Sequence, residues 1–154
     1  MIKILFVCHG NICRSPMAEF VMKKMVQDLQ LSAKFEIASA ATSTEEIGNP
    51  VYPPAKRMLE RHGIDCSQKT ARQMTVSDYK YYDYIVLMDQ NNLHNLRWIL
   101  PPEALKDRKI SLLMDWVGKS RDVADPWYTG DFEATWRDVN EGCKAMLDAI
   151  CKSL

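Results

Sequence analysis

The chain reads Ile2-Lys3-Ile4-Leu5-Phe6-Val7-Cys8-His9-Gly10-Asn11-Ile12-Cys13-Arg14-Ser15-Pro16 near its start, and this stretch decides the fold. Residues 2–7 are mostly apolar and rich in β-branched side chains, which predicts a buried strand. The polar, glycine-containing segment 8–14 predicts a loop. Ser15-Pro16 is typical of a helix start, with Ser15 as the N-cap and proline at the first helical position. A strand, a loop and a helix are therefore expected to meet here.

The rest of the chain repeats the alternation of strands and helices. We expect further strands at 35–39, 84–88 and 110–113, and helices at 17–29, at 54–62 and at 132–150, where apolar residues recur every three or four positions. This order predicts an α/β fold in which 1–154 form a single domain, a doubly wound, four-stranded parallel sheet flanked by helices. Ligands of such sheets bind at the carboxyl ends of the strands, where the loop after the first strand lies.

Composition limits the function classes. The 154 residues carry 20 Lys and Arg against 20 Asp and Glu, so nothing favours a nucleic-acid or anionic-membrane partner. No apolar run reaches membrane-spanning length and no signal peptide is evident, which predicts a cytoplasmic protein. Five cysteines at irregular spacing do not form the framework of a secreted protein. We expect a monomer.

Residues 8–15 have the features of an anion site. The amides of a helix N-terminus and its dipole attract an anion, and Gly10 and Asn11 can take the backbone angles that turn amides inward. The planar guanidinium of Arg14 can donate two parallel hydrogen bonds to two oxygens of a tetrahedral oxyanion. Phosphate is therefore the expected ligand, and we call residues 8–15 the phosphate loop.

The same surroundings favour the thiolate of Cys8, which predicts a nucleophile. We expect in-line attack of the Cys8 sulfur on phosphorus to give a cysteinyl-phosphate, with Arg14 and the loop amides stabilising the equatorial oxygens. The chain has neither an ATP-binding nor a dinucleotide-binding glycine motif, so no cofactor is expected. Cys8, His9 and Cys13 lack a second ligand pair at zinc spacing, so no metal is expected either.

The string Val7-Cys8-x-Gly10-Asn11-x-Cys13-Arg14-Ser15-Pro16 resembles the signature of the low-molecular-weight protein tyrosine phosphatases. The resemblance continues through 39–43, 47–50, 61–64, 71–73, 88–89 and 125–128 and so covers nearly the whole chain. It implies an enzyme that hydrolyses phosphotyrosine or aryl phosphate monoesters through a cysteinyl-phosphate. The implied partner is a phosphotyrosine-containing protein or peptide, and inorganic phosphate is the product.

A phosphatase of this kind needs a proton donor for the leaving group. The family places its general acid at an Asp-Pro pair, which is Asp125-Pro126 here, in the expected loop before the last helix. Once deprotonated, Asp125 would activate the water that hydrolyses the cysteinyl-phosphate. Trp127 and Tyr128 follow directly and could wall a slot for a phenyl ring, although they could also merely cap the core.

The resemblance assigns roles to the remaining loop residues. Asn11 and Ser39 hold the loop in shape, and the Ser15 hydroxyl supports the Cys8 thiolate. Cys13 would lie close enough to Cys8 for a reversible disulfide that protects the nucleophile, with simple packing as the alternative. The substrate-binding residues implied by the loop are His9, Gly10, Asn11, Ile12, Cys13 and Ser15.

This chain departs from the family pattern at three places. Thr44, Glu45 and Glu46 stand where many members carry an aromatic wall, which predicts a more open and acidic pocket side. His9 stands where an apolar residue is common. Residues 68–70, which are Gln, Lys and Thr, replace a histidine that some members place before the Ala-Arg-Gln segment.

Two other functions use the same loop. A thiol-coupled arsenate reductase would relay oxidation through cysteines after the third strand, where this chain has Met88, Asp89 and Gln90. A phosphocysteine carrier or anion-sensing module would hold phosphate without hydrolysing it, and Asp125 argues against that reading.

Overall fold

The computed structural model describes residues 1–154, and a single parallel sheet forms its centre. Its strands are β1 (Ile2–Cys8), β2 (Phe35–Ala41), β3 (Tyr84–Leu87) and β4 (Ile110–Leu112), in the order β2-β1-β3-β4. β1 pairs with both β2 and β3, so it lies inside the sheet. The predicted α/β fold with four parallel strands is confirmed.

The structure has six α-helices and four short 3₁₀ helices. The α-helices are α1 (Arg14–Asp28), α2 (Pro53–Arg61), α3 (Val76–Tyr81), α4 (Gln90–Asn95), α5 (Pro126–Thr129) and α6 (Phe132–Lys152). The 3₁₀ helices are Ser32–Lys34, Leu96–Trp98, Pro102–Lys106 and Leu113–Val117. None of these helices combines the length and the apolar character that crossing a membrane requires.

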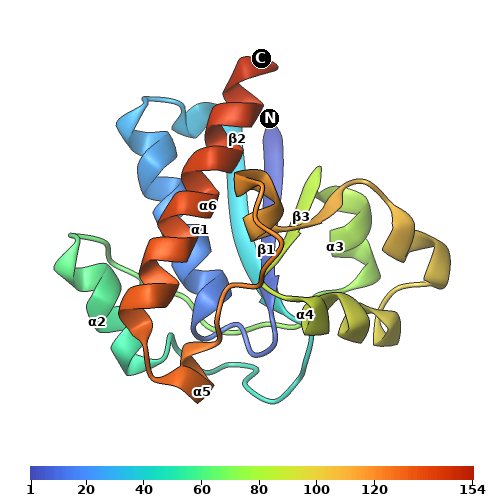
Figure 1. Cartoon of the computed structure of the whole chain (residues 1–154), viewed down its shortest axis with the longest axis horizontal. Coiled ribbons are helices and arrows are strands. Elements are labelled where there is room, and N and C mark those ends of the chain that lie inside the picture. Colours follow the sequence, from blue (N-terminus) through green and yellow to red (C-terminus); the bar gives the residue numbers. More distant parts are fainter.

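Helices cover both faces of the sheet because the side chains of β1 alternate between two apolar clusters. Ile4 and Phe6 pack into a cluster with α1, α2 and α6, whereas Leu5 and Val7 pack into a second cluster with Tyr82 and the segment 96–104. Figure 1 shows α1 and α6 side by side on one side of the sheet and α3 on the other. A strand buried on both faces explains the continuous apolar run at 2–7.

The carboxyl ends of the central strands point away from the two chain termini (Figure 1). Cys8 is the last residue of β1 and is in register with Ala41 at the end of β2. The loop after β1 leads directly into α1, and α5 lies at this same end of the sheet. The fold therefore brings three distant parts of the sequence to one edge.

The start of α1 differs from the prediction. The helix begins at Arg14 with Cys13 at the N-cap position, so Ser15 lies inside the first turn and is not the cap. The reason is that the Ser15 hydroxyl contacts the Cys8 sulfur and the Asn11 amide. These contacts occupy the oxygen that a cap would turn toward the helix amides.

The three shortest α-helices were not predicted from the sequence. α3, α4 and α5 span only four to six residues, which is too short for a helical repeat of apolar positions to be visible. Capping boxes between Thr75 and Asp78 and between Asp89 and Asn92 begin α3 and α4. The long terminal helix was predicted correctly, although it extends to Lys152.

Candidate active site

A pocket of about 380 Å³ opens at the carboxyl end of β1. The structure brings Cys8, Arg14 and Asp125 together in its lining, although Asp125 is more than a hundred residues from the other two. Asn11 and Ser15, which were predicted to bind substrate, do not line the pocket and lie behind it, buried. The full lining is Cys8, His9, Gly10, Ile12, Cys13, Arg14, Glu45, Glu46, Asp125, Trp127 and Tyr128.

The Cys8 sulfur is buried at the bottom of the pocket and has two polar neighbours. The backbone N–H of Asn11 donates to Sγ at 3.3 Å, and the Ser15 hydroxyl lies 3.0 Å from Sγ. Donors aimed at a sulfur atom stabilise its negative form. This arrangement is suited to a nucleophilic thiolate.

The backbone of the phosphate loop is turned by Asn11, which has a φ of +60°. Gly10 does not adopt the left-handed region; its lack of a side chain matters because an added Cβ would lie 3.3 Å from Cγ of Glu46. The carbonyl oxygens of Cys8 and Ile12 accept hydrogen bonds from Thr42 and Tyr52, outside the loop. In a trans peptide the N–H points opposite to the C=O. The N–H groups of His9 and Cys13 therefore point away from Thr42 and Tyr52.

The Asn11 side chain ties the loop to the sheet. Its Nδ2 atom donates to Ser15 Oγ at 2.8 Å and to Ser39 Oγ at 2.9 Å, and its Oδ1 accepts from the N–H of Arg72 at 3.2 Å. Asn11, Ser15 and Ser39 are all buried, so these bonds are shielded from water. The contacts fit the supporting roles that the family resemblance implies.

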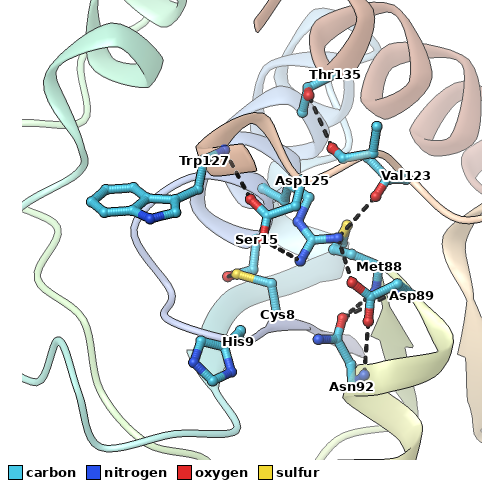
Figure 2. A network of polar contacts seen from close by, with 12 residues as sticks. Cys8, His9, Ser15, Met88, Asp89, Asn92, Val123, Asp125, Trp127 and Thr135 are labelled. Atoms are coloured by element: carbon cyan, nitrogen blue, oxygen red, sulfur yellow. Dashed lines mark hydrogen bonds and ion pairs between the residues drawn. The ribbon is translucent and has the colours of Figure 1, made fainter. Parts of the chain in front are cut away.

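The Arg14 guanidinium is held in a buried frame of acceptors, part of which appears in Figure 2. Nη1 donates to Asp89 Oδ2 at 2.7 Å and to the Val123 carbonyl at 2.8 Å, and Nη2 lies 3.4 Å from Asp125 Oδ2. Burial lowers the pKa of Arg14, but Cys8, Asp89 and Asp125 raise it more, so the pKa lies above its ordinary value. The guanidinium is therefore a fixed positive charge beside the sulfur.

Asp89 is a site residue whose contact with Arg14 the sequence did not indicate. It follows β3, and its Oδ1 accepts the N–H of Asn92 at 2.8 Å. Asn92 Oδ1 in turn accepts the N–H groups of Met88 and Asp89 (Figure 2). These hydrogen bonds fix the position of the carboxylate that holds Arg14. The available signal was its position after a buried strand, because such positions meet at one edge of a parallel sheet.

Asp125 lies in a loop before the last helix, as predicted, and it also caps a short helix that was not predicted. Oδ1 accepts the N–H of Trp127 at 3.0 Å, which makes Asp125 the N-cap of α5. The preceding carbonyl of Ala124 accepts a bond from the Thr135 hydroxyl of α6 at 3.1 Å. Pro126, Trp127 and the Thr135 contact together aim the carboxylate, whose other oxygen faces Arg14 (Figure 2).

Trp127 and Tyr128 form one side of the pocket mouth. Their exposed fractions are 55% and 86%, so neither residue caps the core. The Trp127 ring packs against Tyr52, with ring centroids 4.9 Å apart, and Tyr52 also stacks on Phe132. Tyr52 is a support for the aromatic wall that the sequence pattern did not reveal, because it comes from the start of α2.

The opposite side of the mouth is polar and acidic. His9 Nε2 lies 3.0 Å from Glu45 Oε2, and both side chains are exposed. Glu46 accepts a bond from Asn49 Nδ2 at 2.6 Å. Arg14 is the only Lys or Arg residue of the lining, and it is buried. Glu45 and Glu46 therefore give the mouth the acidic wall that was predicted at their position.

Cys13 lies in the pocket lining and is buried. Burial, followed by the proximity of Cys8 and Asp125, raises the pKa of its thiol to about 12. Cys13 therefore stays protonated at the pH at which Cys8 is expected to react as a thiolate.

Comparison with known proteins shows similarity over nearly the whole chain. The family model "Low molecular weight phosphotyrosine protein phosphatase" matches residues 3–154. The low molecular weight protein-tyrosine-phosphatase YfkJ of Bacillus subtilis is 39% identical, over 99% of this chain and 97% of that protein. The human low molecular weight phosphotyrosine protein phosphatase is 40% identical, over 94% and 93%. The crystal structure of YfkJ superposes with a TM-score of 0.93, covering 99% of this chain and 96% of that chain at 38% identity.

Proposed function

Because this chain belongs to the low molecular weight phosphotyrosine protein phosphatase family, we propose that it hydrolyses phosphotyrosine monoesters with Cys8 as the nucleophile, Arg14 as the phosphate clamp and Asp125 as the general acid and base. One observation carries the assignment of residues. The Cys8 sulfur lies in one pocket with the fixed guanidinium of Arg14 and the capped carboxylate of Asp125.

In the first step the Cys8 thiolate attacks phosphorus. A sulfur–phosphorus bond forms while the bond from phosphorus to the phenolic oxygen breaks, and Asp125 gives its proton to that departing oxygen. The loop amides and the free N–H groups of Arg14 stabilise the equatorial oxygens. The products of this step are the phenol and the cysteinyl-phosphate.

In the second step a water molecule attacks the cysteinyl-phosphate. Asp125, now a carboxylate, takes one proton of that water as the oxygen–phosphorus bond forms and the sulfur–phosphorus bond breaks. Inorganic phosphate leaves, and Cys8 departs as a thiolate that the Ser15 hydroxyl stabilises. Asp125 gives one proton to the phenolic oxygen in the first step and takes one from water in the second, so the enzyme ends the cycle in its starting protonation state.

The pocket mouth supports an aryl substrate. Trp127, backed by Tyr52, offers a flat apolar surface beside the phosphate loop, on which a phenyl ring can stack. A phosphoserine side chain is too short to use this wall. The substrate class is therefore a phosphotyrosine-bearing protein or peptide. We further propose that the enzyme acts as a monomer in the cytoplasm.

Peroxide inactivates such an enzyme by oxidising its thiolate to a sulfenic acid, with release of water. The Cys13 thiol then displaces the sulfenic oxygen as water and forms a Cys8–Cys13 disulfide, which a thiol reductant reopens. The thiolate of Cys13 is the attacking form, so burial, which raises the pKa of this thiol, disfavours the closure.

Pre-steady-state kinetics with p-nitrophenyl phosphate test the proposal. A burst of p-nitrophenol should precede the steady state, and Cys8→Ser should abolish both burst and turnover. Cys151→Ser, which changes a cysteine outside the pocket, is the matched control and should keep both. Undiminished turnover in Cys8→Ser would refute the assignment. A phosphorylated Cys8 that persists for many minutes in the wild-type protein would favour the phosphocysteine carrier.

A reductase function has little support. Cys8 and Cys13 are the only cysteines of the pocket lining, and the position after β3 holds Asp89, which is bonded to Arg14. A thiol relay from the pocket would need a further cysteine at that position.

A further inference from the structure

Two charged residues behind the phosphate loop, one buried and one half-buried, take no part in the steps above. Glu19 comes from α1 and has 5% of its side chain exposed; Lys69 comes from the segment between α2 and α3 and has 12% exposed. Lys69 Nζ donates to the Ser39 carbonyl at 2.9 Å and lies 3.5 Å from Glu19 Oε1. Neither residue lines the pocket.

A continuous row of hydrogen bonds joins this ion pair to the nucleophile. The Ser39 hydroxyl donates to Glu19 Oε1 at 2.5 Å, and Ser39 Oγ accepts from Asn11 Nδ2 at 2.9 Å. The same Asn11 nitrogen donates to Ser15 Oγ at 2.8 Å, and Ser15 Oγ lies 3.0 Å from Cys8 Sγ. The row runs through buried atoms, where hydrogen bonds are stronger than in water.

The chemistry of the donors fixes where each proton of this row points. An ionised carboxylate can only accept, so the Ser39 proton must point to Glu19, and Ser39 is left with lone pairs for Asn11. The Asn11 amide nitrogen can only donate, so Ser15 receives from it. The Ser15 proton then has the Cys8 sulfur as its remaining acceptor in the row. Asn11 therefore donates toward both ends of the row, and the carboxylate at the Glu19 end, by taking the Ser39 proton, keeps the Asn11 nitrogen turned toward Ser39 and Ser15.

A buried carboxylate needs a cation to stay charged. Lys23 contacts the outer oxygen, Oε2, at 2.6 Å, but 44% of its side chain is exposed. Lys69 is the cation beside Oε1, the oxygen that Ser39 uses. Burial lowers the pKa of Lys69, and Glu19 offsets this lowering only in part.

We propose that Lys69 is a positioning residue for the phosphatase reaction: it holds Glu19 as a carboxylate that only accepts, and thereby reserves the Ser15 proton for the Cys8 sulfur. This inference rests on the proposed role of Cys8 as the nucleophile. Lys69 acts through Glu19, Ser39 and Asn11 and does not touch the substrate.

The pH dependence of Cys8 alkylation by iodoacetamide, followed by mass spectrometry of the peptide that carries Cys8, tests the proposal. In Lys69→Met the midpoint of alkylation should rise by about half a pH unit or more, because the thiolate loses its donor. Turnover of p-nitrophenyl phosphate should fall most at low pH and recover as the pH rises. Lys69→Arg should restore most of both, whereas Lys24→Met, which changes an exposed lysine of the same helix as Glu19, should leave both unchanged.

Ser39→Ala separates action through the row from a direct effect of charge. If Lys69 acts through the row, Lys69→Met adds no further shift once Ser39 is alanine. An equal shift in both backgrounds would overturn the proposal, and so would an unchanged midpoint in a folded Lys69→Met protein. Lys69→Gln, which keeps a donor for the Ser39 carbonyl without the charge, repeats the test if Lys69→Met unfolds.

The alkylation test also separates this inference from the proposed function. Failure of the proposed function would appear as continued turnover in Cys8→Ser. Failure of this inference alone would leave Cys8→Ser inactive while the alkylation midpoint of Lys69→Met equals that of the wild type.

Discussion

Behind the phosphate loop, Asn11, Ser15 and Ser39 are buried and bonded to one another, whereas in front of it Glu45, Trp127 and Tyr128 are exposed to solvent. Polar groups inside a protein interact strongly and are costly to leave unpaired, while exposed charges are screened. The buried side is therefore where reactivity is set, and the exposed side adjusts which substrates bind. Substitutions on the two sides should differ by orders of magnitude in their effects.

Among substitutions of pocket residues that keep the nucleophile, Arg14→Lys should produce the largest loss of activity. A lysine keeps the charge but cannot hold Asp89 and Val123 with one nitrogen and face phosphate with the others. We expect kcat/KM for p-nitrophenyl phosphate to fall by about 10²–10³-fold. Product inhibition by inorganic phosphate should weaken in parallel.

Arg121→Lys is the control, because Arg121 pairs with a carboxylate, that of Asp138, outside the pocket. A variant of Arg14 that retained tight phosphate inhibition would contradict the proposed clamp.

Asp125→Asn comes next. Its expected effect depends on the leaving group, because a general acid matters most when the departing oxygen is a poor leaving group. Turnover of phenyl phosphate should fall by roughly 10²-fold or more, and turnover of p-nitrophenyl phosphate by less. The side chain of asparagine can still cap α5 through its oxygen, so folding should be preserved.

Equal losses for the two substrates would indicate that Asp125 does not donate the proton. Asp131→Asn is the control for a lost charge at a helix cap, because Asp131 caps α6 and does not line the pocket.

The sequence indicates the parts of the candidate site that are local and gives no sign of those that depend on contacts across the chain. Cys8 and Arg14 could be placed because strand, loop and helix are contiguous, and the family pattern located Asp125. Asp89 is 75 residues from Arg14, and its contact follows only from the placement of β3 beside β1. The sequence carries no short-range signal for such a pair.

Ser15 and Lys69 illustrate a second kind of limit. Ser15-Pro16 fits a helix cap by local rules, but tertiary contacts with Cys8 and Asn11 determine where the hydroxyl points. Lys69 sits in a segment where the pattern showed only the absence of a histidine. Its half-buried position beside Glu19 could not be inferred, because an isolated lysine is usually exposed.

The smallest effect is expected at the acidic side of the mouth. In the double variant Glu45→Gln/Glu46→Gln, kcat/KM for a phosphotyrosine peptide with flanking lysines should fall by about two- to fivefold, because exposed charges contribute little each. The same peptide with flanking glutamates should improve. Both changes should shrink as the salt concentration rises, since screening weakens exposed charges.

Asp28→Asn supplies the control for net charge, because Asp28 ends α1, far from the pocket, and its charge is also exposed. It should leave the preference between the two peptides unchanged. A change in the glutamine variant that persists at high salt would show that Glu45 or Glu46 acts by shape or by its contact with His9 or Asn49, and not by charge. In that case the division between a buried side that sets reactivity and a screened side that adjusts selection would be wrong for this wall of the pocket.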